Sequence, residues 1–536
     1  MHYSPIKSYP NFLFFVCFMI SAGFIGFHHV LNVAPQSIHY WRQADCTSQT
    51  LNFFKDGMDF FSPRIHNCGW TLDAHTAGEF PIIYYFSAFL YHFFGEQEWI
   101  LRGCNSMMYF VGLWALFRLA FHLTENVVVS ICFSLLFMAS PMLAFYGVNY
   151  LPNVPALSLV FLSWLFFYYF IDTKGLIWFY ACNGALLFAG LIKPTTLVTW
   201  VAIGAIWLFE ILRGIVPKPQ GVFSKKKSVI FPNFWGVIPA FLMVLIPFVS
   251  WRMWADNYNK IHDTEYYFLK TVMPIWDMAL VERENTLRHI EKYALDTWFA
   301  IPTLWVIASI TVLNIILIKK QNPLFFALFS LILAGTVFYF FAFFRQFMVH
   351  DYYATDLFGL GAISILLFLF FLKTHIPALI EKPVFQVLFM AFLIFNLNYT
   401  RQDFTARYEV TDKKYSASND FPLAHFDIKK VRHFINHDTP IREQDTIISL
   451  PDITPNATLY YYDRRGYSYW NFGPTTIWSK DWMQLMVQNH KCKYLIVNDL
   501  TSPVLDSIRP YLKQPIAQLD STIWVYDMQK VIHPTQ

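Results

Sequence analysis

Apolar runs of membrane-spanning length recur along the first three quarters of this 536-residue chain. A helix that crosses a bilayer needs about 20 mainly apolar residues. There are about eleven such runs, near residues 11–31, 99–121, 127–146, 153–171, 175–191, 194–213, 231–251, 296–318, 323–344, 354–373 and 384–399. The pattern predicts an α-helical polytopic membrane protein. A shorter apolar stretch, 80–94, is expected to form a helix at the membrane interface.

The charge content excludes several other classes of protein. Only 14% of the residues are charged, whereas a soluble domain carries roughly 25%. A cytosolic enzyme and a disordered chain are therefore excluded. The net charge of +4 is small for this length, so we expect no nucleic-acid partner. The seven cysteines do not form a disulfide framework, although Cys46 and Cys68 could pair in an oxidising compartment.

Basic residues in short loops predict the orientation, because such loops stay on the cytoplasmic side. They follow the sixth, eighth and tenth runs, on the same side as Lys7. They are Arg213, Lys218, Lys225, Lys226, Lys227, Lys319, Lys320, Lys373 and Lys382. The segments 32–98 and 252–295, and the tail from about residue 400, are then extracytoplasmic. We expect a multi-pass protein of the plasma (inner) membrane.

The composition changes at about residue 400. Strand patterns lie at 445–450, 493–498 and 522–527, and helix patterns at 476–490 and 503–513. We expect a membrane domain over 1–400, including the first outer loop at 32–98, and a small soluble α/β domain over 401–536. The aromatic residues at 460–462 and 467–470 fit either the core of the tail domain or a carbohydrate-stacking surface.

Ionisable and amide side chains gather at the outer membrane boundary. Such residues beside spans are energetically costly, which makes each a candidate for function. The outer set consists of Arg42, Asp45, Asp73, His75, Glu79, Arg102, Asn153, Lys193, Arg345, His350 and Asp351. The inner side carries mainly loop lysines, which topology explains. Because the outer residues come from distant parts of the sequence, their distribution indicates a site.

The first outer segment carries the candidate acid–base groups. Arg42 and Asp45 are three residues apart and would share a helix face, either as an ordinary ion pair or as functional groups. In the functional interpretation, Asp45 accepts a proton from a nucleophile and Arg42 binds a phosphate. Glu79 precedes the interfacial helix, where a carboxylate also suits the helix dipole. Asp73 is a weaker candidate.

Further cations lie at the outer ends of predicted spans. Arg102 and Lys193 either extend to the membrane surface as single side chains do, or join Arg345 in binding an anionic group at headgroup level. The residues expected to contact substrate are Asp73, Asn153, His350, Asp351 and Tyr352. His350 and Asp351 are adjacent, and two adjacent ligands are weak support for a metal. A divalent metal is therefore not favoured, and no cofactor is expected.

Five short motifs follow one another along these segments: WRQAD at 41–45, EFP at 79–81, YLPNVP at 150–155, KP at 193–194 and HDYY at 350–353. By their order and sidedness they resemble the bacterial family 39-like membrane glycosyltransferases, the group of protein O-mannosyltransferases and lipid A aminoarabinose transferases. The similarity covers about residues 10–375. It implies a GT-C fold, a polyprenyl-phosphate-linked sugar donor and catalysis on the outer face.

The same resemblance implies roles for individual residues. The catalytic carboxylate of the first outer loop corresponds to Asp45, with Glu79 as the second candidate. The sequence departs from the family where Cys46 follows Asp45 and where Asn153 stands in place of a carboxylate. Donor phosphate binding is expected of Arg42, Arg102, Lys193 and Arg345.

We therefore predict a hexosyl or pentosyl transferase that moves a sugar from polyprenyl phosphate to a lipid, glycan or protein acceptor. Its partners would be this donor, membrane lipids and an acceptor that the sequence does not specify. A single favoured carboxylate predicts an inverting displacement. The alternative is a transporter or flippase of a lipid-linked sugar. Transporters often have related halves with broken helices and polar groups at the midplane, and neither feature is evident in this sequence.

Overall fold

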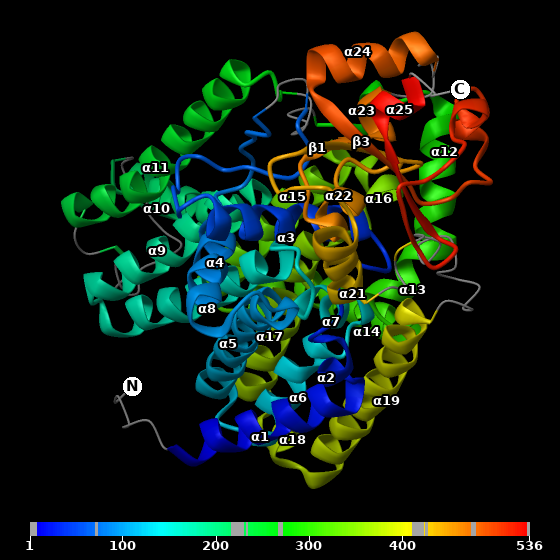
Figure 1. The fold of residues 1–536 in the computed structure, drawn as a ribbon. Coiled ribbons are helices and arrows are strands. Elements are labelled where there is room, and N and C mark those ends of the chain that lie inside the picture. The colour runs from blue at the N-terminus through cyan, green and yellow to red at the C-terminus, as the bar shows by residue number, and fades with distance from the viewer. Residues whose placement is uncertain are drawn as a thin grey trace. The chain divides into compact units, whose positions relative to one another are not determined.

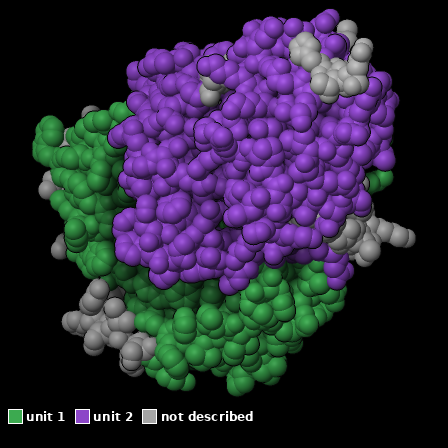
Figure 2. Space-filling view, in the orientation of Figure 1, with its two compact units in different colours: residues 1–30, 103–252, 271–405 green, residues 31–102, 253–270, 406–536 purple. Residues whose placement is uncertain are grey.

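The computed structural model describes residues 8–69, 73–215, 230–231, 234–265, 272–409, 423, 427–472 and 479–532. The chain divides into two compact units, each assembled from separate stretches of sequence (Figures 1 and 2). Unit 1 contains residues 1–30, 103–252 and 271–405, and unit 2 contains residues 31–102, 253–270 and 406–536. The predicted division at residue 400 into membrane and soluble parts stays a prediction.

Unit 1 consists of apolar helices, three of which begin or end in unit 2. The α-helices are α1 (Ser8–Ile25), α2 (Phe27–Val30), α5 (Glu98–Thr124), α6 (Val127–Met138), α7 (Pro141–Gly147), α8 (Asn153–Thr173), α9 (Leu176–Ile192), α10 (Val198–Ile215), α11 (Phe234–Ile261), α12 (Leu280–His289), α13 (Leu295–Trp298), α14 (Ile301–Ile316), α15 (Pro323–Ala342), α16 (Gln346–Val349), α17 (Phe358–His375), α18 (Pro377–Glu381) and α19 (Pro383–Tyr408). Shorter 3-10 or π turns are η1 (Pro194–Leu197), η2 (Ile275–Asp277), η3 (Ile290–Ala294), η4 (Ile318–Lys320) and η5 (Asp351–Leu357).

The described residues of every predicted apolar run lie mainly in helices. Within the described residues, seven helices are long and apolar enough to cross a membrane, or up to nine if each of two bent pairs is one span. The α6–α7 pair is bent by 76°, and the pair formed by Leu280–Trp298 and α14 by 92°. The runs in α1 and α9 form shorter apolar helices, of 18 and 17 residues. The helical membrane fold is confirmed, and the number of about eleven spans stays a prediction.

Local sequence explains the α6–α7 bend and one close helix contact. The Ser140 side chain caps α7 by accepting a hydrogen bond from the Leu143 N–H at 3.2 Å. Pro141 has no N–H with which to continue the hydrogen bonding of α6. Farther along, a Cβ atom on Gly112 of α5 would lie 2.5 Å from the Ser158 Cβ of α8. Only glycine allows α5 and α8 to approach this closely.

Unit 2 contains a sheet and the helices that flank it. Its helices are α3 (Tyr40–Lys55), α4 (Ile82–Phe94), α21 (Ile428–His433), α22 (Ala457–Tyr462), α23 (Tyr469–Phe472), α24 (Lys480–His490) and α25 (Met528–Ile532), with the shorter turns η6 (Phe434–Asp438), η7 (Pro503–Leu505) and η8 (Arg509–Tyr511). The strands are β1 (Thr446–Leu450), β2 (Gly466–Ser468), β3 (Cys492–Val497), β4 (Ala517–Leu519) and β5 (Ile523–Asp527). Their order is β2-β1-β3-β5-β4. β1 is parallel to β2 and β3, whereas β5 is antiparallel to β3 and β4.

The predicted α/β tail is confirmed, with local differences. All three predicted strands are present, as β1, β3 and β5. The helix expected over 476–490 begins at Lys480, and residues 473–478 lie outside the described residues. The expected helix over 503–513 is wrong: only the turns η7 and η8 form there, because Pro510 lies inside the segment and interrupts α-helical hydrogen bonding. β2 and β4 were missed because three residues carry too little periodicity.

The first outer segment supplies part of the core of this sheet. Alternate side chains of the central strands face two apolar layers, as the pleat requires. Ile447 and Ile496 join one layer with Ala44 and Leu51 of α3. The neighbours of these strand residues join the opposite layer, which contains residues of α24 and α25. Tyr460, Tyr461, Tyr462 and Tyr467 are buried in these layers. The core interpretation of these aromatic side chains is therefore correct.

The predicted orientation rests on charges that are only partly visible in the structure. Lys7, Lys218, Lys225, Lys226 and Lys227 lie outside the described residues. The cytoplasmic position of these loops, and the extracytoplasmic position of the tail, stay predictions.

Candidate active site

Arg42 lies between two carboxylates of unit 2, on the first turn of α3. Its Nη1 atom is 3.6 Å from Asp45 Oδ2, and its Nη2 atom forms an ion pair with Glu79 Oε1. The Tyr84 hydroxyl of α4 donates to the same Glu79 oxygen at 2.7 Å. The predicted helix face shared by Arg42 and Asp45 is confirmed. The structure adds Glu79 and Tyr84 to this cluster.

The cluster is largely buried, which strengthens its electrostatics. The exposed fraction is 3% for the Asp45 side chain, 16% for Arg42 and 14% for Glu79. Arg42 and Tyr84 both bind the Oε1 atom of Glu79. Glu79 is therefore suited to hold the guanidinium and the phenol in place.

Cys46, which directly follows Asp45, also contacts this cluster. Its Sγ atom lies 3.2 Å from the Tyr84 hydroxyl. Burial raises the pKa of the Cys46 thiol to about 12, although the positive charge of Arg42 opposes the shift. The thiol is therefore neutral at physiological pH and does not replace a carboxylate. Cys46 and Cys68 are both free and buried.

Asp73 and His75 belong to a second polar group in unit 2. Asp73 Oδ2 lies 2.9 Å from His262 Nδ1, and the His75 and His262 rings stack with centres 4.3 Å apart. The His75 Nδ1 atom also hydrogen-bonds the Tyr258 hydroxyl. Within the described ranges, no three His, Cys, Asp or Glu side chains are arranged to hold a metal ion.

Arg102 is a fully buried cation. Its Nε and Nη2 atoms donate to the Val33 carbonyl at 3.1 and 2.9 Å. The guanidinium thus fixes the backbone of the segment that leads into α3. The side chain does not extend to a surface, which was one of the two interpretations of its position.

In unit 1, Lys193 lies against aromatic rings at the end of α9. Its Nζ atom is 4.0 Å from the ring centre of Tyr353 and 5.4 Å from that of Tyr352. Such cation–π contacts hold an ammonium in place while its N–H groups can still bind an anion. Pro194 starts η1 directly after Lys193, and this turn sets the position of the lysine.

Other predicted residues join this aromatic cluster of unit 1. Asn153 Nδ2 donates to the Tyr352 carbonyl at 3.3 Å, and the His350 ring stacks on Tyr352. The Tyr146 hydroxyl donates to Asp351 Oδ1. Residues of three motifs that lie far apart in the sequence thus gather in unit 1: Asn153, Lys193, and the adjacent Asp351 and Tyr352.

Arg345 lies apart from these contacts. Its Nη2 atom is 3.6 Å from Glu282 Oε1, and both side chains are 45% exposed. This pair has the character of a surface ion pair. A pocket shared by Asp45 of unit 2 and Lys193 of unit 1 stays a prediction.

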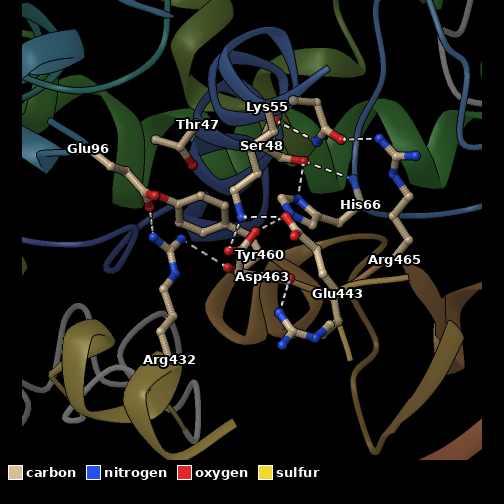
Figure 3. A network of polar contacts seen from close by, with 12 residues as sticks. Thr47, Ser48, Lys55, His66, Glu96, Arg432, Glu443, Tyr460, Asp463 and Arg465 are labelled. Carbon is tan, nitrogen blue, oxygen red and sulfur yellow. Dashed lines mark hydrogen bonds and ion pairs between the residues drawn. The ribbon is translucent and has the colours of Figure 1, made fainter. Parts of the chain in front are cut away.

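Sequence reasoning missed a buried network that ties α3 to the tail of unit 2 (Figure 3). Ser48 Oγ lies 2.7 Å from His66 Nδ1, His66 Nε2 lies 3.1 Å from Asp463 Oδ1, and Lys55 pairs with Asp463 Oδ2. Arg465 binds Asn52 Oδ1 at 2.9 Å. The i, i+4, i+7 spacing of Ser48, Asn52 and Lys55 on one helix face was the available signal.

Comparisons with other proteins identify the type of fold. No family sequence model and no curated protein sequence matches the chain. Solved structures do match, and they show a GT-C-like fold, that of membrane glycosyltransferases, as predicted. ArnT from Cupriavidus metallidurans in the apo state aligns with 98% of this chain and 99% of its own, at a TM-score of 0.57 and 10% identity. The mycobacterial arabinofuranosyltransferase AftD aligns with 96% of this chain and 41% of its own, at a TM-score of 0.50 and 12% identity.

Proposed function

We propose that the chain is a membrane glycosyltransferase that transfers a hexose or pentose from a polyprenyl-phosphate-linked donor to a lipid, glycan or protein acceptor. One observation carries the proposal. A chain with a GT-C-like fold over nearly its whole length holds a largely buried arginine, Arg42, between the carboxylates Asp45 and Glu79. Largely buried charges are costly for a protein to fold with, and they are common in active sites.

Asp45 is the proposed general base. It would take the proton from the acceptor hydroxyl or amine as that group attacks the anomeric carbon. The bond from this carbon to the phosphate oxygen breaks, and the phosphate leaves with the electron pair. One displacement inverts the anomeric configuration. We assign Glu79 to positioning Arg42, because its Oε1 atom already binds the Arg42 guanidinium and the Tyr84 hydroxyl.

The leaving phosphate is the proposed ligand of the cations. Lys193 is best suited, because the Tyr352 and Tyr353 rings hold its ammonium. Arg42 is a second candidate. Arg102 already binds the Val33 carbonyl and Arg345 already pairs with Glu282, so each would have to bind the phosphate in addition to its present partner. Substrate contacts are proposed for Asp73, Asn153, His350, Asp351 and Tyr352. We further propose that the reaction takes place on the extracytoplasmic face of the inner membrane.

A transfer assay with Asp45→Asn tests the proposal. The purified chain would receive polyprenyl phosphate carrying radiolabelled sugar, together with membrane acceptors. Loss of a general base lowers rates by about 10² to 10⁴, so we expect transfer to fall by that factor. Asp59→Asn is the matched control, because Asp59 is exposed and outside the cluster. Wild-type transfer by the Asp45→Asn variant, or retention of the anomeric configuration, contradicts the mechanism.

A transporter would behave differently in the same material. It would carry the lipid-linked sugar across a vesicle membrane and leave the sugar–phosphate bond intact. A glycosyltransferase releases free polyprenyl phosphate in step with the transferred sugar. Measuring this lipid product therefore separates the two classes.

A further inference from the structure

Unit 1 contains a recess whose lining is unusually polar for a bundle of apolar helices. It lies among α8, η1, α10, α15, η5 and α17, beside Trp164 of α8. Its polar lining consists of Thr195, Thr196, Thr199, Thr336, Tyr339 and Asp356. An ionisable side chain among membrane helices is costly and points to a functional role. None of these six residues belongs to the predicted site.

Asp356 has an acceptor atom that the protein leaves available. Its Oδ2 atom accepts a hydrogen bond from the Thr195 hydroxyl at 2.5 Å. Its Oδ1 atom is buried and receives no donated hydrogen bond from the described part of the chain. The neighbouring Tyr339 hydroxyl gives its single proton to the Tyr353 carbonyl at 2.8 Å instead. A buried carboxylate oxygen without a donor is destabilising and requires an explanation. A ligand that donates a hydrogen bond in the recess provides one.

The neighbouring hydroxyls offer the complementary groups. The Thr199 oxygen accepts the Trp164 indole N–H at 3.2 Å, which leaves its own proton to donate. The Thr196 hydroxyl donates to the Lys193 carbonyl at 2.7 Å, which leaves its oxygen lone pairs to accept. The recess therefore presents both donors and acceptors, as a ligand with hydroxyl groups requires.

The charges beside the recess and its volume limit which ligands it can bind. Lys193 acts on Asp356 as an attractive positive charge, so the two charges offset each other and a neutral ligand is favoured over an ammonium. The recess leaves about 30 Å³ for the centres of water-sized groups. This is room for roughly two waters or hydroxyls, and too little for a whole sugar ring.

We infer that this recess binds two neighbouring hydroxyl groups of the sugar on the lipid-linked donor, with Asp356 as the acceptor that selects for them. The inference rests on the proposed function and deepens it, because it assigns sugar recognition to residues outside the predicted site. A site built to hydrogen-bond a hydroxyl discriminates strongly against ligands that lack it, since its own polar groups are then unpaired.

Binding measurements on the full chain in nanodiscs test this role. The probes are decaprenyl phosphate alone and decaprenyl phosphate carrying glucose, mannose or arabinose. For the wild type, we expect at least one glycosylated lipid to bind more tightly than the bare phosphate. Asp356→Asn should reduce this gain for the preferred sugar by roughly tenfold or more. It should not weaken the binding of decaprenyl phosphate, because it removes a negative charge that acts on Lys193, the proposed phosphate ligand. Thr336→Val, a near-isosteric change, should reduce the same gain even if Asp356→Asn folds poorly.

The control variant is Asp172→Asn. Asp172 is exposed and lies near the C-terminal end of α8, beyond the residues of this helix that line the recess. It should bind every probe like the wild type. The inference is overturned if the wild type gains nothing from any of the sugars, or if both recess variants keep the full gain. If the wild type does not bind even decaprenyl phosphate, the proposed donor is wrong, which is a separate failure.

Discussion

Glu79, in the segment before α4, forms an ion pair with Arg42 on the first turn of α3. This contact joins two motifs that are 37 residues apart, and it turns an i, i+3 pair on one helix into a cluster of three charges. Asp45 and Glu79 thus hold the Arg42 guanidinium from two sides. The orientation of the guanidinium is therefore set before a reaction begins.

Replacing Glu79 by Gln should lower transfer less than replacing Asp45 by Asn. Glutamine keeps a hydrogen-bond acceptor for Tyr84 but removes the charge that orients Arg42. Loss of one charge-assisted hydrogen bond corresponds to roughly a 10- to 100-fold fall in kcat. Steady-state transfer kinetics give the comparison. Glu284→Gln, an exposed glutamate of α12, is the control, and equal rates for the Glu79→Gln variant and the wild type would refute the positioning role.

Lys193→Ala should raise KM for the lipid-linked donor by roughly 10- to 100-fold, because an ammonium–phosphate hydrogen bond is lost. Lys193→Arg should retain much of the affinity, since its charge and its contact with the tyrosine rings persist. Donor titrations of both variants provide the measurement. Lys373→Ala removes a lysine that pairs with Glu125 and Glu381 instead, and should behave as wild type. If the Lys193→Ala and Lys193→Arg variants have the same KM for the donor, the positive charge at position 193 does not bind the donor.

The stability of unit 2 should fall on acidification. Burial lowers the pKa of His66, against the pull of Asp463. Burial alone would raise the pKa of Asp463, but the His66 hydrogen bond and the charges of Arg432 and Lys55 hold it well below its usual range. The unfolded chain therefore takes up protons at higher pH than the folded chain. Stability is then lost below about pH 6.5 as unfolded histidine titrates, and further below about pH 4 as unfolded aspartate does.

Asp463→Asn tests this network directly. It leaves Lys55 and His66 without their anionic partner, so unfolding at pH 7 should become easier by about 3 kcal/mol, and the loss below pH 4 should shrink. Limited proteolysis of the full chain from pH 4 to pH 8 reports on both effects. Asp520→Asn removes an exposed partner of Lys430 in the same unit and should change stability by less than about 1 kcal/mol. Identical pH profiles for the Asp463→Asn variant and the wild type would rule the network out as the cause.

Gly466→Ala should disrupt the sheet edge formed by β1 and β2. A Cβ atom there would lie 2.0 Å from the Ile447 carbonyl oxygen, and a backbone atom in a strand cannot move aside cheaply. Overpacking of this kind costs about 3 kcal/mol or more. Urea-dependent proteolysis of unit 2 measures the effect. Gly359→Ala, where the added atom meets nothing within 4 Å, should be tolerated, and equal stability of the two variants would contradict the packing argument.

Much of the fold was readable from the sequence because membrane helices and strands carry strong local signals. The length of each apolar run predicts a helix, and alternation predicts β1, β3 and β5. The helix expected over 503–513 did not form, because Pro510 inside it has no N–H for α-helical hydrogen bonding. The pairing of Arg42 with Asp45 followed from helix geometry alone. The contacts of Glu79 with Arg42 and Tyr84, by contrast, had no local signal.

By itself, the sequence determined that this chain is a helical membrane protein with an α/β tail, and which residues are costly enough to suggest function. Hydrophobic periodicity and the free-energy cost of a charge near lipid depend on each segment alone, so both can be read from the sequence. Only the tertiary structure decided that α3 packs on the sheet of unit 2, that Asp463 pairs with Lys55 and His66, and that Asp356 lines a hydroxyl-rich recess. Those contacts join residues hundreds of positions apart, and their partners are chosen by packing, which no single segment encodes.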